Sequence, residues 1–426
     1  MSTSAGAPTL IRNVAVFDGT RPHTPQDVLL DGPVIAAVGP ALAAPAGATV
    51  VDGSGRTLLP GLIDAHTHTS DTDQLRRALL FGITTELDMG GTPSVARAVR
   101  EAARERDDLA DLRIATTGAT APGGHPSQLV GLGLLAPFPT VSGPEDADAF
   151  VAARVADGAD HLKIFIEDGS AIGTPMPLMS AATIKALVRA AHERGLRTAA
   201  HTLTRRSARL AIDCGVDGLA HAPADGPCDD ALVADAAARG VFVIPTLASL
   251  TGMTDTPAEY ALVDDPRLRP YADPRWLAEI ERMRADGPGQ VRVGPVAADA
   301  RYAADAALRM FEAGVPLLAG TDGTGGEGHP TTHGISYHGE LALLVAAGLT
   351  PAQALTAATA APADAFGLHD RGRVAAGLRA DLLLVEGNPL TDITAVRDIA
   401  ALWRRGVPVD RTTHLAAVRA QGPVRS

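Results

Sequence analysis

Cysteine is nearly absent from this sequence of 426 residues. Its two cysteines, Cys214 and Cys228, are too few for a disulfide framework, which excludes the small disulfide-stapled secreted proteins and fits a reducing compartment. No apolar run reaches the ~18 residues that a membrane helix needs. The N-terminus has no basic stretch followed by an apolar core, so we expect no signal peptide. These absences predict a soluble, cytoplasmic protein.

Positive charge is also scarce. Lysine and arginine total 37 against 49 acidic residues, which gives a formal net charge of −12. Because an acidic surface does not attract polyanions, we expect neither nucleic acid nor an anionic membrane as a partner. The sequence also lacks low-complexity tracts and repeats at the periods typical of solenoids.

A regular alternation of strand and helix begins near Leu59. Several helical patterns end at a glycine just before the next strand, as at Gly195, Gly215, Gly240 and Gly314, which is typical of a helix C-cap inside a βα repeat. Eight strands of this kind predict a (β/α)₈ TIM-like barrel. An open doubly wound sheet is the alternative, but no glycine-rich phosphate-binding motif supports it. The expected strands are Leu62–His66, Thr84–Asp88, Arg113–Thr117, His161–Glu167, Arg197–Thr202, Gly218–Ala222, Val241–Thr246 and Pro316–Gly320.

Both ends of the chain read as short β-strands separated by Gly, Pro and Asp turns. We expect the two ends to pair into one small antiparallel sheet domain of β-sandwich type. This divides the chain into a composite β domain, residues 1–57 plus 369–426, and a barrel domain, residues 58–368. The strands expected at the ends are Thr9–Phe17, Asp27–Leu30, Val34–Val38, Ala48–Asp52, Arg373–Val374, Asp381–Val385 and Ile399–Val409.

Two long segments interrupt the alternation, Thr120–Gly143 and Leu247–Pro295. Each follows the C-terminal end of an expected strand, which is the face where barrel enzymes place their active sites. We therefore expect both segments to act as lids or pocket walls.

The stretch LPGLIDAHTH, Leu59 to His68, carries the first sign of chemistry. In a strand, His66 and His68 point to the same side and form a ready pair of metal ligands. Two such histidines alone are more often ordinary surface or core residues. Here other expected strands end in or contain further polar residues, and in a barrel they would converge on the same cavity. These residues are Lys163, His201, His221 and Asp322.

Lys163 is unusual because a buried, unpaired ammonium beside metal ions is costly. It could pair with a carboxylate, lose its proton, or react with carbon dioxide to form a carbamate that bridges metals. Charge alone does not separate the last two outcomes.

The chain resembles the amidohydrolase superfamily, in the branch near imidazolonepropionase and the prolidase-like carboxypeptidases. The resemblance rests on PGLIDAHTH, GADHLKIF, AAHT, GLAH, VIPTL, AGTDG and GRVAAGLRADLLLVEGNPL, which occur in the family's order between residues 60 and 390. It implies a binuclear centre of two divalent metal ions, with Zn²⁺ the best fit, and an N-carboxylated Lys163. The implied metal ligands are His66, His68, Lys163, His201, His221 and Asp322.

The resemblance also implies a reaction. A metal-bridged hydroxide would attack the carbonyl of an amide-type C–N bond in a small amide, dipeptide, N-acyl amino acid or cyclic amide. Asp322 would be the catalytic residue that relays the proton. A lactonase or esterase using the same centre, or a catalytically silent metal-binding scaffold, are the alternatives. The expected partner is a small-molecule substrate, and the sequence is also compatible with a homo-oligomer.

Two further histidines are candidates for contact with the substrate. His125 lies in the GGHP segment of the first interruption, and His333 lies in an HG…E pattern that continues to Glu340. We expect His333, Glu340 and the nearby His329 mainly to support the site. Because Thr120–Gly143 contains no Arg or Lys, the sequence favours a neutral, mostly apolar substrate.

Overall fold

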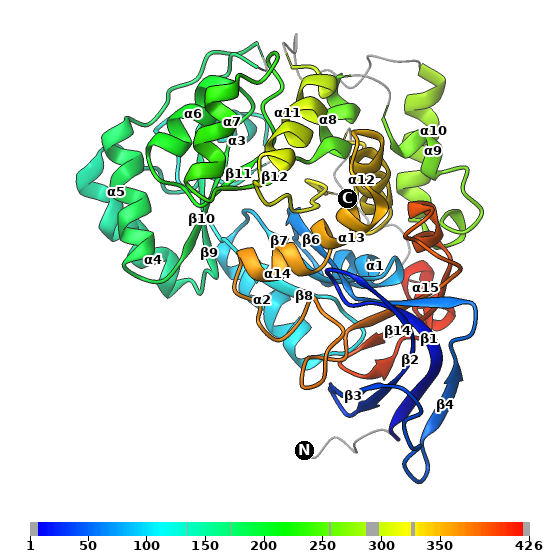
Figure 1. Ribbon diagram of the computed structural model, residues 1–426. Coiled ribbons are helices and arrows are strands. Elements are labelled where there is room, and N and C mark those ends of the chain that lie inside the picture. Colours follow the sequence, from blue (N-terminus) through cyan, green and yellow to red (C-terminus); the bar gives the residue numbers. More distant parts are fainter. Residues whose placement is uncertain are drawn as a thin grey trace.

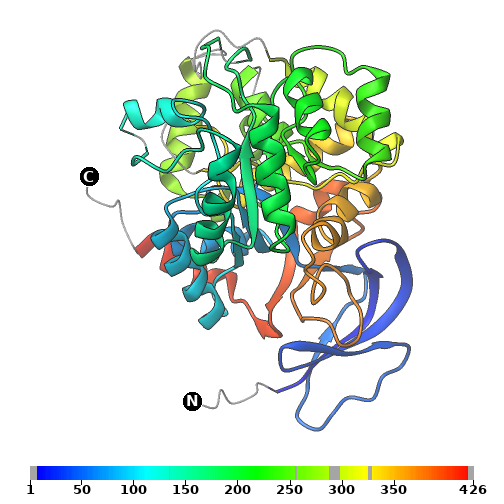
Figure 2. The ribbon, with the colours of Figure 1, turned by 90° about the vertical axis from the view of Figure 1, so that its left-hand side faces the viewer.

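A computed structural model describes residues 7–133, 135–171, 173–254, 257–286, 298–324 and 329–420. Strands from both ends of the chain form one sheet, drawn in dark blue and red at the lower right of Figure 1. The parallel strands and most of the helices form the rest of the molecule above it (Figures 1 and 2). Within the described residues, no helix is long and apolar enough to cross a membrane.

The terminal sheet has eight strands in the order β15-β14-β13-β5-β1-β2-β3, with β4 paired to β1. It is mixed and not purely antiparallel as predicted, because β1 runs parallel to both β4 and β5. All eight strands belong to this one sheet, which does not confirm the predicted sandwich. The bounds are β1 Thr9–Phe17, β2 Pro22–Asp31, β3 Val34–Gly39, β4 Thr49–Asp52, β5 Arg56–Pro60, β13 Leu382–Glu386, β14 Ile399–Arg404 and β15 Val407–Pro408.

The C-terminal segment contains one regular hairpin and lacks one of the expected strands. β14 and β15 form a hairpin whose two-residue loop, Arg405 and Gly406, has positive φ at both positions. This is the type I′ turn that fits the twist of a hairpin. The short strand expected at Arg373–Val374 does not form, and Val374 instead donates a single backbone hydrogen bond to Asp18.

The parallel strands form two sheets, β6-β7-β8 and β12-β11-β10-β9. Seven of the eight predicted strands are present, and nearly all their residues are buried, as expected for strands covered on both faces. The bounds are β6 Leu62–Thr67, β7 Ile83–Asp88, β8 Asp111–Ile114, β9 His161–Phe165, β10 Arg197–His201, β11 Gly218–Ala220 and β12 Phe242–Ile244.

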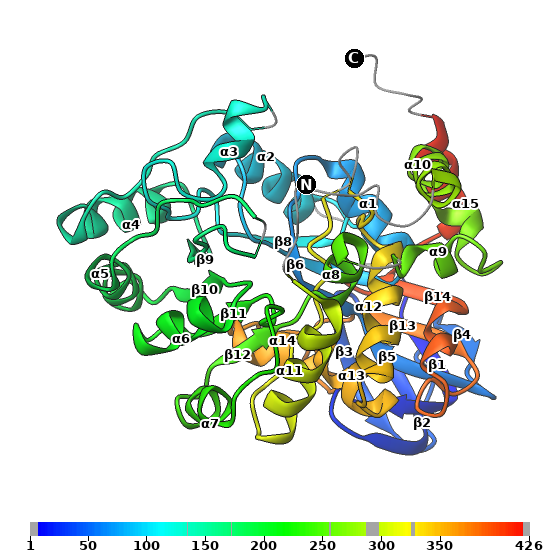
Figure 3. The same ribbon diagram turned by 90° about the horizontal axis from the view of Figure 1, so that it is seen from above.

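The eighth predicted strand, Pro316–Gly320, is not a regular strand. Its residue Leu317 makes an isolated parallel bridge to Val243 in β12, and Gly323 makes another to Thr67 in β6. A third bridge joins Ala119 to Ile164, between the end of β8 and β9. Both gaps between the two sheets are therefore spanned by backbone pairing, and helices surround these strands when seen from above (Figure 3).

Helices fill the connections between the parallel strands. Gly195, Gly215, Gly240 and Gly314 all have positive φ directly after a helix, as the C-cap pattern predicted. The longer helices are α1 Thr72–Leu80, α2 Pro93–Glu105, α4 Ala147–Ala156, α5 Ala181–His192, α6 Arg205–Asp213, α7 Asp230–Ala238, α8 Leu247–Thr254, α10 Pro274–Asp286, α11 Ala300–Glu312, α12 Ile335–Ala346 and α15 Arg411–Ala420. The shorter ones are α3 Ser127–Gly131, α9 Glu259–Leu262, α13 Pro351–Ala357, α14 Ala360–Ala365 and the 3₁₀ turns η1 Pro144–Asp146, η2 Arg269–Tyr271 and η3 Ile393–Arg397.

The two interruptions follow β8 and β12. The first contains α3, and the second contains α8, α9, η2 and α10, with Trp276 buried in α10. The indole nitrogen of Trp276 donates to the carbonyl of Pro330 at 2.8 Å, which ties this segment to the loop after Asp322. Residues 134, 255–256 and 287–295 of the interruptions lie outside the described residues.

Candidate metal centre

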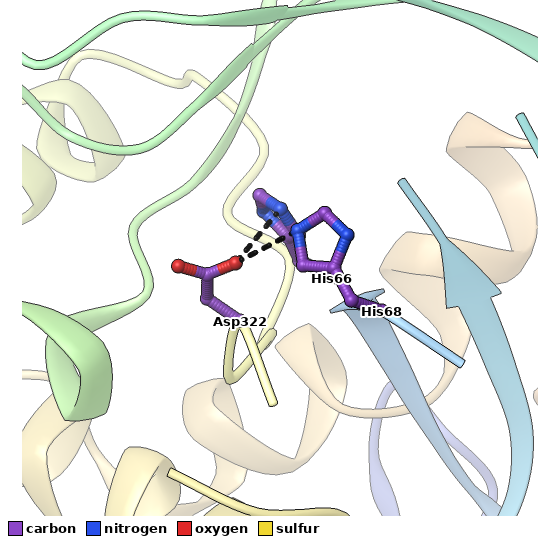
Figure 4. A group of neighbouring side chains, drawn as sticks. All are labelled: His66, His68 and Asp322. Carbon is purple, nitrogen blue, oxygen red and sulfur yellow. Dashed lines mark ion pairs between the residues drawn. The ribbon is translucent and has the colours of Figure 1, made fainter. Parts of the chain in front are cut away.

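Three of the predicted metal ligands meet at one point (Figure 4). The Nε2 atoms of His66 and His68 lie 3.3 Å and 3.2 Å from the same carboxylate oxygen, Oδ1 of Asp322. Each of these residues offers a ligand atom within 4.8 Å of the others. Two imidazoles and a carboxylate are a common donor set for zinc and related divalent ions.

The other three predicted ligands continue from this group. Nζ of Lys163 lies 3.4 Å from Nε2 of His66. The ring of His221 lies 4.9 Å from that of His66, and its Nε2 is 3.1 Å from Nδ1 of His201. The structure therefore brings all six residues into one connected cluster, although their roles as ligands stay predictions.

Hydrogen bonds fix the orientation and the tautomer of the His68 and His221 imidazoles. Nδ1 of His68 lies 3.1 Å from the carbonyl oxygen of Gly90, so this nitrogen carries a proton and donates it. The hydroxyl of Thr246 donates to the carbonyl of Pro245 and therefore accepts from Nδ1 of His221, at 2.5 Å. In a neutral ring this leaves the lone pair on Nε2 of each histidine, the arrangement that metal-binding histidines need.

Burial controls the titration of most of the cluster; in His68 it acts to lower the pKa, but the hydrogen bond to Asp322 outweighs it and raises the pKa. Burial lowers the pKa of His221 to about 3 and that of Lys163 to about 7, and it holds the pKa of His66 and His201 well below the ordinary value. Burial acts against ionisation of Asp322 too, but the neighbouring histidines outweigh it and hold its pKa well below the ordinary value. Neutral imidazoles beside an ionised carboxylate are the protonation states of metal ligands.

The environment of His201 also fits a metal centre. Nε2 of His201 is buried and has no hydrogen-bond partner in the described part of the chain. A buried imidazole nitrogen that makes no hydrogen bond lowers the stability of the folded protein. A cation bound to its lone pair would remove that cost.

The backbone at this site is held in unusual conformations. Asp322 and Thr246 are not glycines but have φ of +58° and +52°, in the left-handed region. Such residues cost about 1–3 kcal/mol each and occur mainly where function requires them. Gly320 allows the chain to approach β6 closely, because a Cβ at this position would lie only 2.9 Å from the backbone nitrogen of His66 and 2.5 Å from Ile244. The AGTDG motif thus lets the chain pass close to β6 and then turn the Asp322 carboxylate towards both histidines.

Sequence reasoning missed a set of residues that hold this group in place. Ser249, in α8, donates its hydroxyl to Oδ2 of Asp322 at 3.1 Å. Asp64 accepts hydrogen bonds from the backbone and hydroxyl of Thr321, at 3.0 Å and 2.7 Å, and so joins β6 to the Asp322 segment. Both contacts are tertiary and leave no local pattern in the sequence.

Glu86 and Asp88 were also missed, although a signal for them existed. They lie two residues apart in the buried strand β7, where charged side chains are costly without partners. Both carboxylates accept hydrogen bonds from Thr69, the residue after His68. The hydroxyl of Thr69 donates to Glu86 at 2.9 Å, and its backbone N–H donates to Asp88 at 3.1 Å.

The remaining predicted residues lie in distinct places. His125 stacks on His201 with ring centroids 4.6 Å apart, and its Nδ1 contacts Gln128 at 2.9 Å. His333 contacts Glu86 at 2.9 Å, and within the described part of the chain no hydrogen bond joins it to the six-residue cluster. Glu340 accepts the backbone N–H of Ala248 at 2.7 Å, at the start of α8. His329 contacts the hydroxyl of Thr331, which donates to the carbonyl of Asp322.

A cavity of about 230 Å³ adjoins the cluster. Its walls come from the loop after β7, the segment after β8, residues 135–139 of the first interruption, Arg154 and Phe165. Phe165 separates it from the cluster, since the Phe165 ring lies 5.8 Å from the His201 ring and 5.7 Å from Nζ of Lys163. The sequence predicted that apolar residues of this interruption would line a pocket, and Leu135 to Pro139 do so.

Known proteins resemble the chain over most of its length. The model of the amidohydrolase family matches residues 57–409. An imidazolonepropionase from Anaeromyxobacter dehalogenans is 30% identical over 366 residues, which are 79% of this chain and 77% of that protein. A dihydroorotase from Streptomyces coelicolor is 55% identical over 60 residues, only 14% of this chain and 13% of that protein. The crystal structure of an Xaa-Pro dipeptidase with bound methionine in the active site superposes with a TM-score of 0.75 at 22% identity, covering 95% of this chain and 100% of that one.

Proposed function

Because the chain belongs to the amidohydrolase family, and is thus a hydrolase acting on C–N bonds, we propose that it cleaves an amide-type bond of a small molecule at the cluster around Asp322. The resemblance identified in the sequence is thereby confirmed. The observation that carries the proposal is the meeting of His66 and His68 on one oxygen of Asp322, beside a cavity of substrate size.

We propose that His66, His68, Lys163, His201, His221 and Asp322 hold two divalent metal ions, with Zn²⁺ the best match to this donor set. When bound, such ions polarise a carbonyl and supply a water of lowered pKa. The protein's own part is to keep the carboxylate ionised and the imidazoles of His66, His201 and His221 neutral, and burial of these three rings supports that state.

Asp322 is the group we assign to proton transfer. Its Oδ1 faces the two histidines, while its Oδ2 accepts a hydrogen bond from Ser249. A carboxylate held from both sides can accept the proton of the attacking water and deliver it to the leaving nitrogen without changing position.

For Lys163 we propose the carbamate. Burial lowers its pKa to about 7, so near neutral pH a large share of the side chain is a neutral amine. That amine can attack carbon dioxide, with loss of a proton from nitrogen, and the product is an anion instead of a cation next to His66. The exchange removes the like-charge cost of an ammonium beside metal ions.

The finer features of the fold are part of the proposal. We infer that the two parallel sheets work as one eight-stranded barrel, which the bridges at Thr67, Ala119 and Val243 support. We likewise propose that residues 1–57 and 369–426 form a composite β domain of sandwich type. The partner that we propose for the protein is its small-molecule substrate. The two free, buried cysteines support a reducing, cytoplasmic compartment.

Metal removal tests the proposal. Protein purified without chelator should contain close to two transition-metal ions per chain, and chelation should abolish turnover of the best substrate in a panel of N-acyl amino acids, dipeptides, cyclic amides, esters and lactones. Re-addition of zinc should restore turnover, which controls for damage by the chelator. Full activity in metal-free protein would refute the proposal, and a panel in which only lactones or esters react would move it to the esterase alternative.

A further inference from the structure

The helix α8 begins beside the six-residue cluster, and its capping residue is used by that cluster. The carbonyl of Thr246 accepts the first helical hydrogen bond, from the backbone N–H of Leu250 at 3.1 Å. A threonine in this position normally has an extended backbone and accepts an N–H of the first turn with its hydroxyl. Here φ of Thr246 is +52°, and its hydroxyl donates to the carbonyl of Pro245 and accepts from Nδ1 of His221. The hydroxyl is therefore engaged by the cluster instead of by α8.

Glu340 supplies the missing acceptor from a neighbouring helix. It lies in the middle of α12, is fully buried, and accepts the backbone N–H of Ala248, the second residue of α8, at 2.7 Å. A capping hydroxyl on Thr246 would accept this same N–H or the next one. Because the first N–H groups of a helix have no partner within it, a buried first turn needs an acceptor from elsewhere. Burial raises the pKa of Glu340 to about 8, and the neutral acid can accept this bond as the carboxylate does.

The residue after Ala248 contacts the cluster directly. Ser249 is fully buried and donates its hydroxyl to Oδ2 of Asp322 at 3.1 Å. A serine side chain is short and has only a few staggered positions, so the place of its hydroxyl follows the place of the helix backbone. The bond between Glu340 and Ala248 therefore fixes the position from which Ser249 reaches Asp322.

We propose that Glu340 is a positioning residue for the hydrolysis: it anchors the first turn of α8, so that Ser249 holds Oδ2 of Asp322 in place. Within the described part of the chain, no hydrogen bond joins Glu340 itself to the six-residue cluster. This rests on the proposed amide hydrolysis at Asp322 and adds a residue that acts on it from another helix. The sequence predicted only that Glu340 supports the site, and the route runs through α8.

A double-mutant cycle tests this route. Glu340→Met removes the acceptor and roughly keeps the volume of the side chain, whereas Ser249→Ala removes the hydroxyl. Each variant should lower kcat by about three- to tenfold and leave KM within about twofold, the effect of one hydrogen bond lost in the transition state. The double variant should be no slower than Ser249→Ala, because Glu340 acts through Ser249. Glu340→Gln keeps a carbonyl acceptor and should retain kcat within about twofold.

Cobalt in place of zinc gives a readout that needs no turnover. Co²⁺ can bind the same imidazole and carboxylate donors, and its visible absorption depends on their geometry. Glu340→Met and Ser249→Ala should shift the absorption bands of the cobalt-loaded protein in the same way. The double variant should match Ser249→Ala, and Glu340→Gln should match the unmodified protein. If no compound in the panel reacts, the proposed function fails, whereas these spectra still decide the role of Glu340.

Glu259 provides the matched control for the loss of a buried carboxylate. It begins α9, which packs against α12, and it is fully buried, but within the described residues no hydrogen bond joins it to α8. Glu259→Met should leave kcat and the cobalt spectrum unchanged, whatever its effect on the melting temperature. A loss of stability alone therefore does not count as support. Glu340→Ala takes the place of Glu340→Met in the cycle if the latter does not fold.

Three results would overturn the proposal. One is an unchanged kcat and an unchanged cobalt spectrum in Glu340→Met. Another is a further loss of kcat, or a further spectral shift, when Glu340→Met is added to Ser249→Ala, since Glu340 would then act by a different route. The third is an equal loss in Glu340→Gln or in Glu259→Met, which would show that any change at these buried carboxylates disturbs the site.

Discussion

The two oxygens of Asp322 have different surroundings, and this decides what the residue can do. Oδ1 faces Nε2 of His66 and His68, while Oδ2 is held by the hydroxyl of Ser249. The backbone N–H of Asp322 donates to the carbonyl of His66 at 2.8 Å, so the carboxylate is fixed relative to the histidines despite its left-handed φ. Little reorganisation is then needed when a proton is transferred.

Replacing Asp322 with Asn removes the proton acceptor but keeps the shape. We expect the chemical step to slow by about 10²–10⁴-fold, measured in single-turnover experiments with metal content determined on the same sample. Ser249→Ala is the control, because it removes one hydrogen bond to Asp322 and leaves the base; it should cost about tenfold or less. An Asp322→Asn variant that binds metal and turns over at a near-normal rate would show that another residue is the base.

The role of Lys163 can be tested by comparing a small replacement, which leaves space for an added acid, with a large one that fills this space. Lys163→Ala should lose most bound metal and activity, and short carboxylic acids such as acetate should partly restore both by replacing the carbamate. Lys163→Met should lose as much, but its side chain fills the space, so acids should not rescue it. Full metal content in Lys163→Ala, or mass spectrometry and crystallography that find an unmodified amine paired with a protein carboxylate, would contradict the carbamate.

At the scale of elements, the first interruption, Thr120–Gly143, places His125 against the six-residue cluster. Its ring stacks on His201 and meets the edge of Phe165, with centroids 5.4 Å apart, and burial lowers its pKa to about 4. His125 is therefore neutral at working pH. A neutral imidazole held above the cluster can share a hydrogen bond with a substrate oxygen without adding positive charge.

His125→Ala should lower kcat/KM by about 10- to 100-fold, the effect of losing one hydrogen bond in the transition state. Gln128→Ala, which removes only the partner of Nδ1, should have a smaller effect in the same direction. Steady-state kinetics with the best substrate would check both. Unchanged kinetics in His125→Ala would remove His125 from the substrate site.

The elements that the sequence predicted best are those fixed by local physical chemistry. Buried parallel strands and glycine-capped helices leave short-range patterns, and His66, His68, Lys163, His201, His221 and Asp322 stand in or directly after expected strands. What was missed depends on pairing between distant segments. The parallel β1–β4 contact, the irregular pairing of Leu317, and the contacts of Ser249 and Glu340 follow from tertiary packing, for which the sequence has no local signal.

At the scale of the whole molecule, a buried ionic group joins the parallel strands to the terminal sheet. Asp111, at the start of β8, pairs with Arg371 and with Arg379, the latter at 3.1 Å, and Arg404 of β14 lies 3.9 Å away. Burial acts to raise the pKa of Asp111, but Arg371 and Arg379 outweigh it and lower the pKa to about 2. Ionised Asp111 thus stabilises the contact between the two parts.

The lowered pKa gives a stability that depends on pH. Because the folded-state value lies below the ordinary 3.8, the unfolded chain binds more protons between those pH values. The contribution, about 2 kcal/mol, should be complete above about pH 4 and lost as the pH falls towards about 2. Asp111→Asn should remove this dependence and lower the free energy of unfolding at pH 7 by about 1–3 kcal/mol, because Arg371 and Arg379 lose one charged partner and keep Asp370 and Asp381.

Urea unfolding at pH 7 and at lower pH would measure both effects. Asp31→Asn is a suitable control, since Asp31 is exposed at the end of β2, and it should change the free energy of unfolding by no more than about 0.5 kcal/mol. A loss of stability on acidification that is the same in Asp111→Asn as in the unmodified protein would place the acid-sensitive contact elsewhere.

The order of strands in the terminal sheet also affects how the chain is made. β5 lies between β1 and β13, so one edge of β5 has no neighbour until the ribosome has produced residues near 386. Until then Leu58 and Leu59, fully buried in the finished protein, stand on an open strand edge, and such edges recruit other chains. A nascent chain that ends shortly before β13 therefore exposes this edge, although most of its helices and parallel strands have already been synthesised.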